Sequence, residues 1–131
     1  VLPRCTLPGR RGSVSFSFSA GGIGDNRMTS AAYFSKEWNC ILLLKGHKTC
    51  ITDGMRGYLN QTGNPGMAVG GSGDVLAGMI VSLLGQGVQP IEAAACAAWL
   101  HGAAGDLCAG EFGQYGMLPT DMLTRLPRLM K

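Results

Sequence analysis

The sequence predicts an α/β fold in which helices cover a sheet, and three observations carry this prediction. Short apolar, strand-like segments come first, a glycine-rich loop follows at residues 63–73, and long helical segments fill the remainder. Hydrophobic residues make up 46% of the 131 residues and charged residues only 15%, a balance typical of a folded domain rather than a disordered chain. Strands followed by helices are expected to pack as layers around one core.

The first element of the regular pattern is a helix over residues 26–38, whose apolar residues recur at helical spacing and which Asp25 or Asn26 could cap. A continuous apolar run follows at residues 40–44 and stops at a lysine and a glycine. Such a run favours a strand buried on both faces, as in a parallel sheet.

Two shorter strands are expected next. Residues 49–52 predict the first of them, which ends in an Asp53-Gly54 turn, and residues 57–60 predict the second. Near the start of the chain, residues 13–19 alternate serine with apolar residues, as a half-buried strand does. No nearby segment is typical of a partner strand, so the structure of this segment is left open.

Three helices are expected after the loop. Residues 74–84 are apolar and end at a Gly-Gln-Gly sequence, which is typical of a helix end. Pro90 suits a helix start, and the alanine-rich residues 91–109 continue it. Residues 119–121 predict the entry to a last helix over residues 122–130.

Composition excludes several functional classes. A net charge of +3 is too small to argue for nucleic-acid binding, and no apolar run reaches the length of a membrane span or a signal peptide. The five cysteines include no CxxC pair, so we expect reduced, mostly buried side chains in a cytoplasmic protein. With only His47 and His101 available, no spacing matches a zinc site, and no metal ligand is assigned.

Three large side chains are expected to serve packing. Trp38 and Trp99 are most simply anchors of the core. His101 lies on the alanine-rich helix and is expected to be a packed, hydrogen-bonded core residue, while Gly102 and Gly105 allow a neighbour to approach closely.

The glycine-rich loop is the segment most suggestive of chemistry. Gly70, Gly71, Ser72 and Gly73 directly precede a helix, so their N–H groups and the helix dipole would converge on one point. This arrangement predicts an anion hole for a phosphate. The loop is neither a Walker loop nor a GxGxxG sequence.

Asp74 follows this loop and has two interpretations. A carboxylate beside an anion hole repels phosphate, so its presence favours a general base that takes a proton from a hydroxyl group. Alternatively, Asp74 is only a helix cap and the glycines form a tight turn. The residues of the loop alone do not distinguish a general base from a helix cap at Asp74.

A second candidate segment consists of Lys45, Gly46, His47, Lys48 and Thr49. It follows a buried strand, where α/β proteins place ligand-binding loops, and its lysine and threonine could hold a nucleotide phosphate or ribose. The alternative is a basic surface hairpin.

Four sequence motifs together resemble those of the ADP-dependent NAD(P)H-hydrate dehydratases, a family of the ribokinase-like superfamily. They are Leu-Leu-Lys-Gly-x-x-Thr at 43–49, Gly-Asn-Pro-Gly-Met-Ala-x-Gly-Gly-Ser-Gly-Asp at 63–74, His-Gly-Ala-Ala-Gly-Asp at 101–106 and Gly-Met-Leu-Pro-Thr-Asp at 116–121. The resemblance implies a ribokinase-like layered fold of which residues 25–131 form the C-terminal part.

This resemblance implies a repair lyase that dehydrates the 6S hydrate of NADH or NADPH and converts ADP into AMP and phosphate. By analogy, Asp74 would contact the hydrate and activate its hydroxyl group, which is phosphorylated before phosphate leaves. Gly70–Gly73 would stabilise the transferring phosphoryl group, and Lys45–Thr49 with Gly73 would hold the AMP part of ADP. Magnesium would bridge the phosphates.

Residues 1–24 depart from the family pattern. They contain no acidic residue and lack the Thr-Pro-His-Pro-Gly-Glu motif expected near the start, and family members are about twice as long as this chain. We therefore divide the chain into an atypical segment, 1–24, and a dehydratase portion, 25–131. A shifted reading frame or a mis-called gene start would explain the former. The alternatives are a sugar or vitamin hydroxymethyl kinase of the same superfamily, or a truncated nucleotide-binding fragment. A fragment with an unpaired sheet edge is expected to form homo-oligomers.

Overall fold

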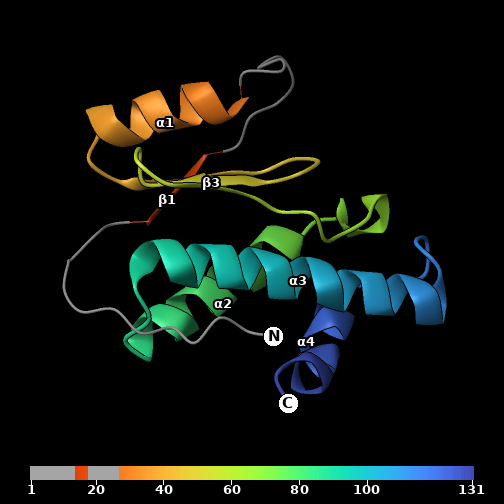
Figure 1. The fold of residues 1–131 in the computed structure, drawn as a ribbon. Coiled ribbons are helices and arrows are strands. Elements are labelled where there is room, and N and C mark those ends of the chain that lie inside the picture. The colour runs from red at the N-terminus through yellow and green to blue at the C-terminus, as the bar shows by residue number, and fades with distance from the viewer. Residues whose placement is uncertain (1–13, 18–26) are drawn as a thin grey trace.

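A computed structural model describes residues 14–17 and 27–131, and its strands form one four-stranded sheet (Figure 1). The predicted caps Asp25 and Asn26 lie outside the described residues, as does Cys5. The elements, in chain order, are β1 (Val14–Ser17), α1 (Arg27–Glu37), β2 (Ile41–Leu44), β3 (Cys50–Thr52), β4 (Gly57–Leu59), a 3₁₀ helix η1 (Pro65–Met67), α2 (Ser72–Gly85), α3 (Pro90–Phe112) and α4 (Pro119–Leu129).

The sheet is mixed, with the strand order β1-β2-β3-β4. β1 pairs in parallel with β2, so the alternating segment near the start of the chain does have a partner, beginning with Val14 opposite Ile41. β2 and β3, and then β3 and β4, pair antiparallel through short connections. The parallel setting expected for residues 40–44 is therefore correct on one edge of β2 and wrong on the other, because only a short hairpin separates β2 from β3.

Helices cover both faces of the sheet, and β2 is buried between them. Ile41 and Leu43 pack with Ile51 against α2 and α3, whereas Leu42 and Leu44 pack on the other face against Ala31 of α1. Figure 1 shows α1 on one side of the sheet and α2 with α3 on the other. This two-sided burial explains why the sequence of β2 is continuously apolar rather than alternating.

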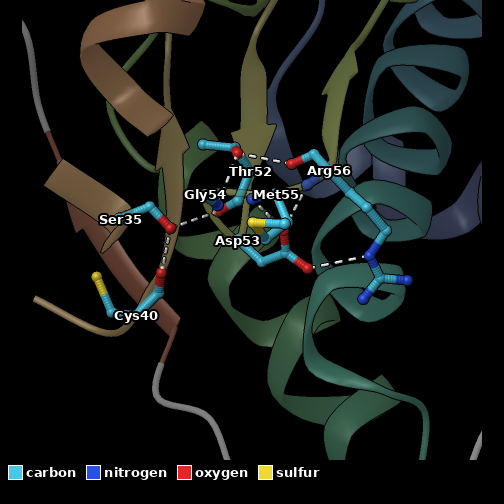
Figure 2. Close-up of polar contacts among 7 residues, drawn as sticks. All are labelled: Ser35, Cys40, Thr52, Asp53, Gly54, Met55 and Arg56. Atoms are coloured by element: carbon cyan, nitrogen blue, oxygen red, sulfur yellow. Dashed lines mark hydrogen bonds and ion pairs between the residues drawn. The ribbon is translucent and has the colours of Figure 1, made fainter. Parts of the chain in front are cut away.

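A polar network fixes the predicted Asp53-Gly54 turn between β3 and β4 (Figure 2). Oδ1 of Asp53 accepts the N–H groups of Met55 at 2.9 Å and Arg56 at 2.6 Å, and Oδ2 accepts Nε of Arg56 at 3.0 Å. Burial raises the pKa of Asp53, but these backbone and side-chain hydrogen bonds outweigh it, so the net shift is downward from 3.8. On the far side of β3, the buried Ser35 hydroxyl of α1 donates to the Thr52 carbonyl at 3.2 Å.

The two tryptophans are not core anchors, so that prediction was wrong. Trp38 is 65% exposed because α1 ends just before it, and its ring packs against Phe34, with ring centroids 5.5 Å apart. Trp99 is 47% exposed on α3, whose alanines form the buried face instead. The face of α3 that packs with the sheet and α2 is made largely of small alanine side chains, and Trp99 lies off that face.

The helix boundaries agree with the prediction to within a few residues. The last helix begins at Pro119, where Oδ2 of Asp121 accepts the N–H of Leu118 at 2.8 Å. Met117 and Met122 form a second core with Ala104 and Cys108, which attaches α4 to the C-terminal half of α3. Among the helices described, none is both long and apolar enough to cross a membrane.

Candidate functional site

The glycine-rich loop enters α2 through a left-handed turn at Gly71. Its φ of 94° and ψ of −19° lie in a region that favours glycine. The helix therefore starts at Ser72, two residues earlier than expected. Two backbone bonds close this first turn, from Ser72 N–H to the Val69 carbonyl at 3.3 Å and from Asp74 N–H to the Gly71 carbonyl at 3.1 Å.

Backbone donors remain available at this helix start. Across residues 14–17 and 27–131, the N–H groups of Gly70, Gly71 and Gly73 make no hydrogen bond. The positive end of the α2 dipole lies at the same place. The segment predicted as an anion hole thus has donors for an anion, although the N–H of Ser72 is already used by Val69.

Lys45 connects the two candidate segments. It is half-buried directly after β2, and a Cβ placed on Gly73 would lie 2.7 Å from its Nζ atom. Because residue 73 has no side chain, the ammonium group can lie against the first turn of α2. A positive charge is therefore placed beside the available N–H groups, which is the combination that binds phosphate.

Arg27 holds the hairpin between β2 and β3, a role that the sequence did not predict. Its guanidinium donates to the carbonyls of Leu44 at 3.2 Å, Lys45 at 2.9 Å and His47 at 2.8 Å. It also lies so close to Gly46 that a Cβ there would be 2.6 Å from Nη2. No local sequence pattern predicts these hydrogen bonds, because the acceptor carbonyls lie 17 to 20 residues from Arg27 in the sequence.

The remaining residues of the second candidate segment form the hairpin tip. His47 and Lys48 are exposed, and Lys48 adopts a φ of 55°. The hydroxyl of Thr49 donates to the Gly46 carbonyl at 3.3 Å. The surface-hairpin interpretation thus describes residues 46–49 locally, whereas Lys45 lies against Gly73 of the glycine-rich loop.

Asp74 is exposed in the first turn of α2 and is not its cap. The cap position belongs to Gly71, and no side chain caps the helix there, so the helix-cap alternative for Asp74 is wrong. Asp74 instead is one of the residues that line a groove of about 520 Å³ between α2, α3 and α4, whose walls include Leu100 and Leu126. A carboxylate in this position is accessible to a ligand held at the helix start.

His101 of α3 is buried beneath the same helix start, as expected. It is 6% exposed, and its Nε2 lies 3.3 Å from the hydroxyl oxygen of Ser72. Burial, reinforced by the nearby charge of Lys45, lowers the pKa of His101 from 6.5 to about 4, and a hydrogen bond to the Ser72 backbone opposes both. The imidazole is therefore neutral near neutral pH and acts as a hydrogen-bonding support for Ser72.

Glycines on α3 let the start of the loop approach this helix closely. A Cβ on Gly102 would lie 2.6 Å from the carbonyl carbon of Thr62, and one on Gly105 would lie 2.7 Å from Cγ of Met67. The packing role predicted for both glycines is confirmed. The loop is thus held against α3 at Met67, and Thr62 just before the loop packs against the same helix.

Magnesium has no assigned protein ligand. In the part of the chain that the structure describes, no three histidine, cysteine, aspartate or glutamate side chains gather into a metal site. Cys40, Cys50 and Cys108 are buried and Cys96 is half-buried, and none of these four described cysteines is part of a disulfide, which agrees with the prediction of reduced, mostly buried cysteines.

Several known proteins resemble this chain in sequence. The family profile described as NAD(P)H-hydrate dehydratase matches residues 13–128. A bifunctional NAD(P)H-hydrate repair enzyme from Moorella thermoacetica is 50% identical over 115 residues, covering 86% of this chain and 22% of that protein. The chain therefore spans less than a quarter of the length of this relative.

Two solved structures show the same fold. An ADP/ATP-dependent NAD(P)H-hydrate dehydratase from Bacillus subtilis, co-crystallised with ATP and Mg²⁺, gives a TM-score of 0.74 at 31% identity, covering 98% of this chain and 51% of that chain. A ribokinase-like superfamily protein from Enterococcus faecalis gives a TM-score of 0.76 at 34% identity, covering 89% and 43% respectively. The fold is thus the ribokinase-like layered fold, represented here by about half of its length.

Proposed function

The chain belongs to the NAD(P)H-hydrate dehydratase family, and from this premise we propose that it takes part in ADP-dependent dehydration of the 6S hydrate of NADH or NADPH. The products would be the reduced dinucleotide, AMP and phosphate. One observation carries the proposal, namely that Lys45 lies against Gly73. This contact joins the two segments that sequence reasoning assigned separately to the nucleotide and to phosphoryl transfer.

The proposed phosphate site combines three kinds of positive potential. The available N–H groups of Gly70, Gly71 and Gly73, the α2 dipole and the Lys45 ammonium all lie at one helix end. Preorganised donors of this kind stabilise charge that develops on a transferring phosphoryl group. Residues 45–49 and Gly73 would then hold the AMP part of ADP.

Asp74 is the residue proposed to act on the hydrate. As general base it would take the proton of the hydrate's hydroxyl group, whose oxygen attacks the terminal phosphorus of ADP while AMP leaves. Breaking the carbon–oxygen bond then releases phosphate, and loss of a proton from the adjacent ring carbon restores the double bond of the reduced nicotinamide ring, while Asp74 returns its own proton to water. Over both steps one hydrate and one ADP give one reduced dinucleotide, one AMP and one phosphate, so the atoms balance.

The residues around the start of α2 suit the binding of a nucleotide phosphate. Mg²⁺ is proposed only as a bridge between phosphates. The B. subtilis structure was co-crystallised with ATP and Mg²⁺, but for this chain the metal has no protein ligand assigned. Mg²⁺ would neutralise charge on the phosphates. We also propose that the protein acts in the cytoplasm, which reduced cysteines favour. We further propose that it forms homo-oligomers, which a measured mass in solution tests.

The decisive assay mixes the protein with NADH hydrate, ADP and Mg²⁺ and follows the absorbance of the reduced nicotinamide. Recovery of absorbance, with AMP formed in equal amount, supports the proposal. Asp74→Asn should lower the rate by roughly 10²- to 10⁴-fold, because general-base catalysis contributes about that much, while ADP affinity stays within about twofold. Absence of recovery with intact ADP binding would instead identify the chain as a nucleotide-binding portion.

A further inference from the structure

The motif at residues 101–106 is not used by the proposed reaction, although it holds both ends of the glycine-rich loop. His101 at one end of the motif contacts Ser72, where the loop enters α2. Asp106 at the other end contacts the residues where the loop begins. A single stretch of α3 therefore spans the loop from start to finish.

Asp106 makes two hydrogen bonds to the loop with the two oxygens of its carboxylate. Oδ2 accepts the backbone N–H of Gly63 at 3.0 Å, and Oδ1 accepts Nδ2 of Asn64 at 2.9 Å. The amide of Asn64 continues the network, because its Oδ1 accepts the N–H of Gly66 at 3.0 Å. This last bond caps η1, the 3₁₀ helix inside the loop.

The hydrogen bonds of Asp106 to Gly63 and Asn64, together with the bond from Gly66 to Asn64, are called the clamp below. A series of backbone turns connects this clamp to the start of α2. Met67 N–H bonds to the Asn64 carbonyl at 3.1 Å, and Ala68 N–H bonds to the Pro65 carbonyl at 3.0 Å. The next turn runs from Val69 to Ser72 and is followed by the turn from Gly71 to Asp74. Each turn fixes the direction in which the next one begins.

We propose that Asp106 is a positioning residue, which through Asn64 and Gly63 sets the direction of the loop and hence the placement of Gly70–Asp74. The inference rests on the proposed function for its catalytic meaning. Asp106 itself touches no reacting atom in this proposal. The structural part of the proposal is that residue 106 affects the turn before Asp74, and this effect can be tested without measuring turnover.

Three variants test the clamp with matched shape. In Asp106→Asn the introduced amide presents a donor to the Asn64 amide, so at least one of the three hydrogen bonds is lost. In Asn64→Asp two carboxylates face each other. The double exchange, Asn64→Asp with Asp106→Asn, restores all three bonds. The amide introduced at position 106 then accepts from Gly63 and donates to the carboxylate introduced at position 64, which still accepts from Gly66.

The primary readout is backbone hydrogen exchange at Ser72 and Asp74, whose N–H groups bond to Val69 and Gly71. Each single variant should raise both exchange rates by roughly tenfold, and the double exchange should return them to within about twofold of the parent. Near-UV circular dichroism of every variant confirms that the fold is intact. Where the parent turns over, Asp106→Asn should lower kcat more than it raises KM for ADP.

Two results would overturn the inference. In the first, Gly63 and Gly66 exchange faster in Asp106→Asn while Ser72 and Asp74 are unchanged, so the clamp acts only locally. In the second, the double exchange fails to restore protection at Ser72 and Asp74. If the parent does not restore reduced nicotinamide, the proposed function fails, but the exchange experiment still decides the role of Asp106.

Discussion

Nζ of Lys45 lies against Gly73, so closely that a Cβ on residue 73 would stand 2.7 Å from it. The two residues come from different layers, Lys45 from the end of the central strand β2 and Gly73 from the first turn of α2. A lysine ammonium and the positive end of a helix dipole repel each other, and a bound anion relieves this repulsion. The placement of this pair therefore supports the proposed phosphate site.

Gly73→Ala should weaken ADP binding by roughly tenfold, because the new methyl group displaces the Lys45 ammonium. The fold should not suffer, since alanine favours a helix by about 0.5–1 kcal/mol over glycine. Gly78→Ala, in the same helix, is the matched control, because a Cβ on residue 78 would meet no neighbouring side chain or loop atom within 4 Å. Calorimetric titration with ADP compares the two. Equal affinities would show that Lys45 does not need the space at residue 73.

Acid should destabilise the protein through His101. Its pKa falls from 6.5 to about 4 on folding, so the unfolded chain binds the proton more readily than the folded one. Stability is then fully present above pH 6.5 and is lost as the pH falls toward 4, by up to roughly 3 kcal/mol. Urea unfolding at several pH values measures this slope.

His101→Asn serves as the control for that experiment, since it removes the titrating group. Its stability should be nearly independent of pH from 6.5 down to about 4.5, below which protonation of Glu111, whose pKa is lowered from 4.5 by its hydrogen bond to Arg125, begins to contribute. The lowered pKa of Asp53 acts in the same direction, but its contribution is lost only below 3.8. An unchanged slope in the variant would assign the pH dependence to another group.

Arg27→Ala should loosen the hairpin that carries Lys45. Loss of three bonds to backbone carbonyls should lower the free energy of unfolding by about 1–2 kcal/mol and weaken ADP binding in parallel. Arg128→Ala is the control, because its recorded partner is Glu111 in an exposed ion pair, which contributes little to stability. Thermal unfolding measures the loss of stability in both variants, and ADP titration measures the loss of affinity. Equal effects of the two variants would show that Arg27 does not support the nucleotide site.

Gly102→Ala should destabilise the protein by about 1–3 kcal/mol, because its Cβ would collide with the backbone of Thr62. Gly110→Ala lies on the same helix, where a Cβ meets no atom within 4 Å, and should stabilise it by about 0.5–1 kcal/mol. Chemical denaturation measures both. A tolerated Gly102→Ala would mean that the loop can move away from α3 without loss.

Much of the fold was predictable because its signals are local. A few adjacent residues are enough to predict several elements. Examples are the continuous apolar run of β2, the Gly-Gln-Gly end of α2 and the proline at the start of α3. The partner of β1 was not predictable, because Val14 pairs with Ile41 across a long separation in sequence. The exposure of Trp38 and Trp99 also depends on packing, which composition does not reveal.

For the candidate site, the sequence by itself determined the chemical groups: a glycine-rich loop ending in Asp74, a lysine after a buried strand, and the motifs that place the chain in its family. Tertiary structure alone decided which of these groups meet. Lys45 reaches Gly73, His101 supports Ser72, Arg27 fixes the hairpin and Asp106 holds the loop. The physical reason is that a loop's backbone pattern depends on its own residues, whereas long side chains find partners only after the layers have packed.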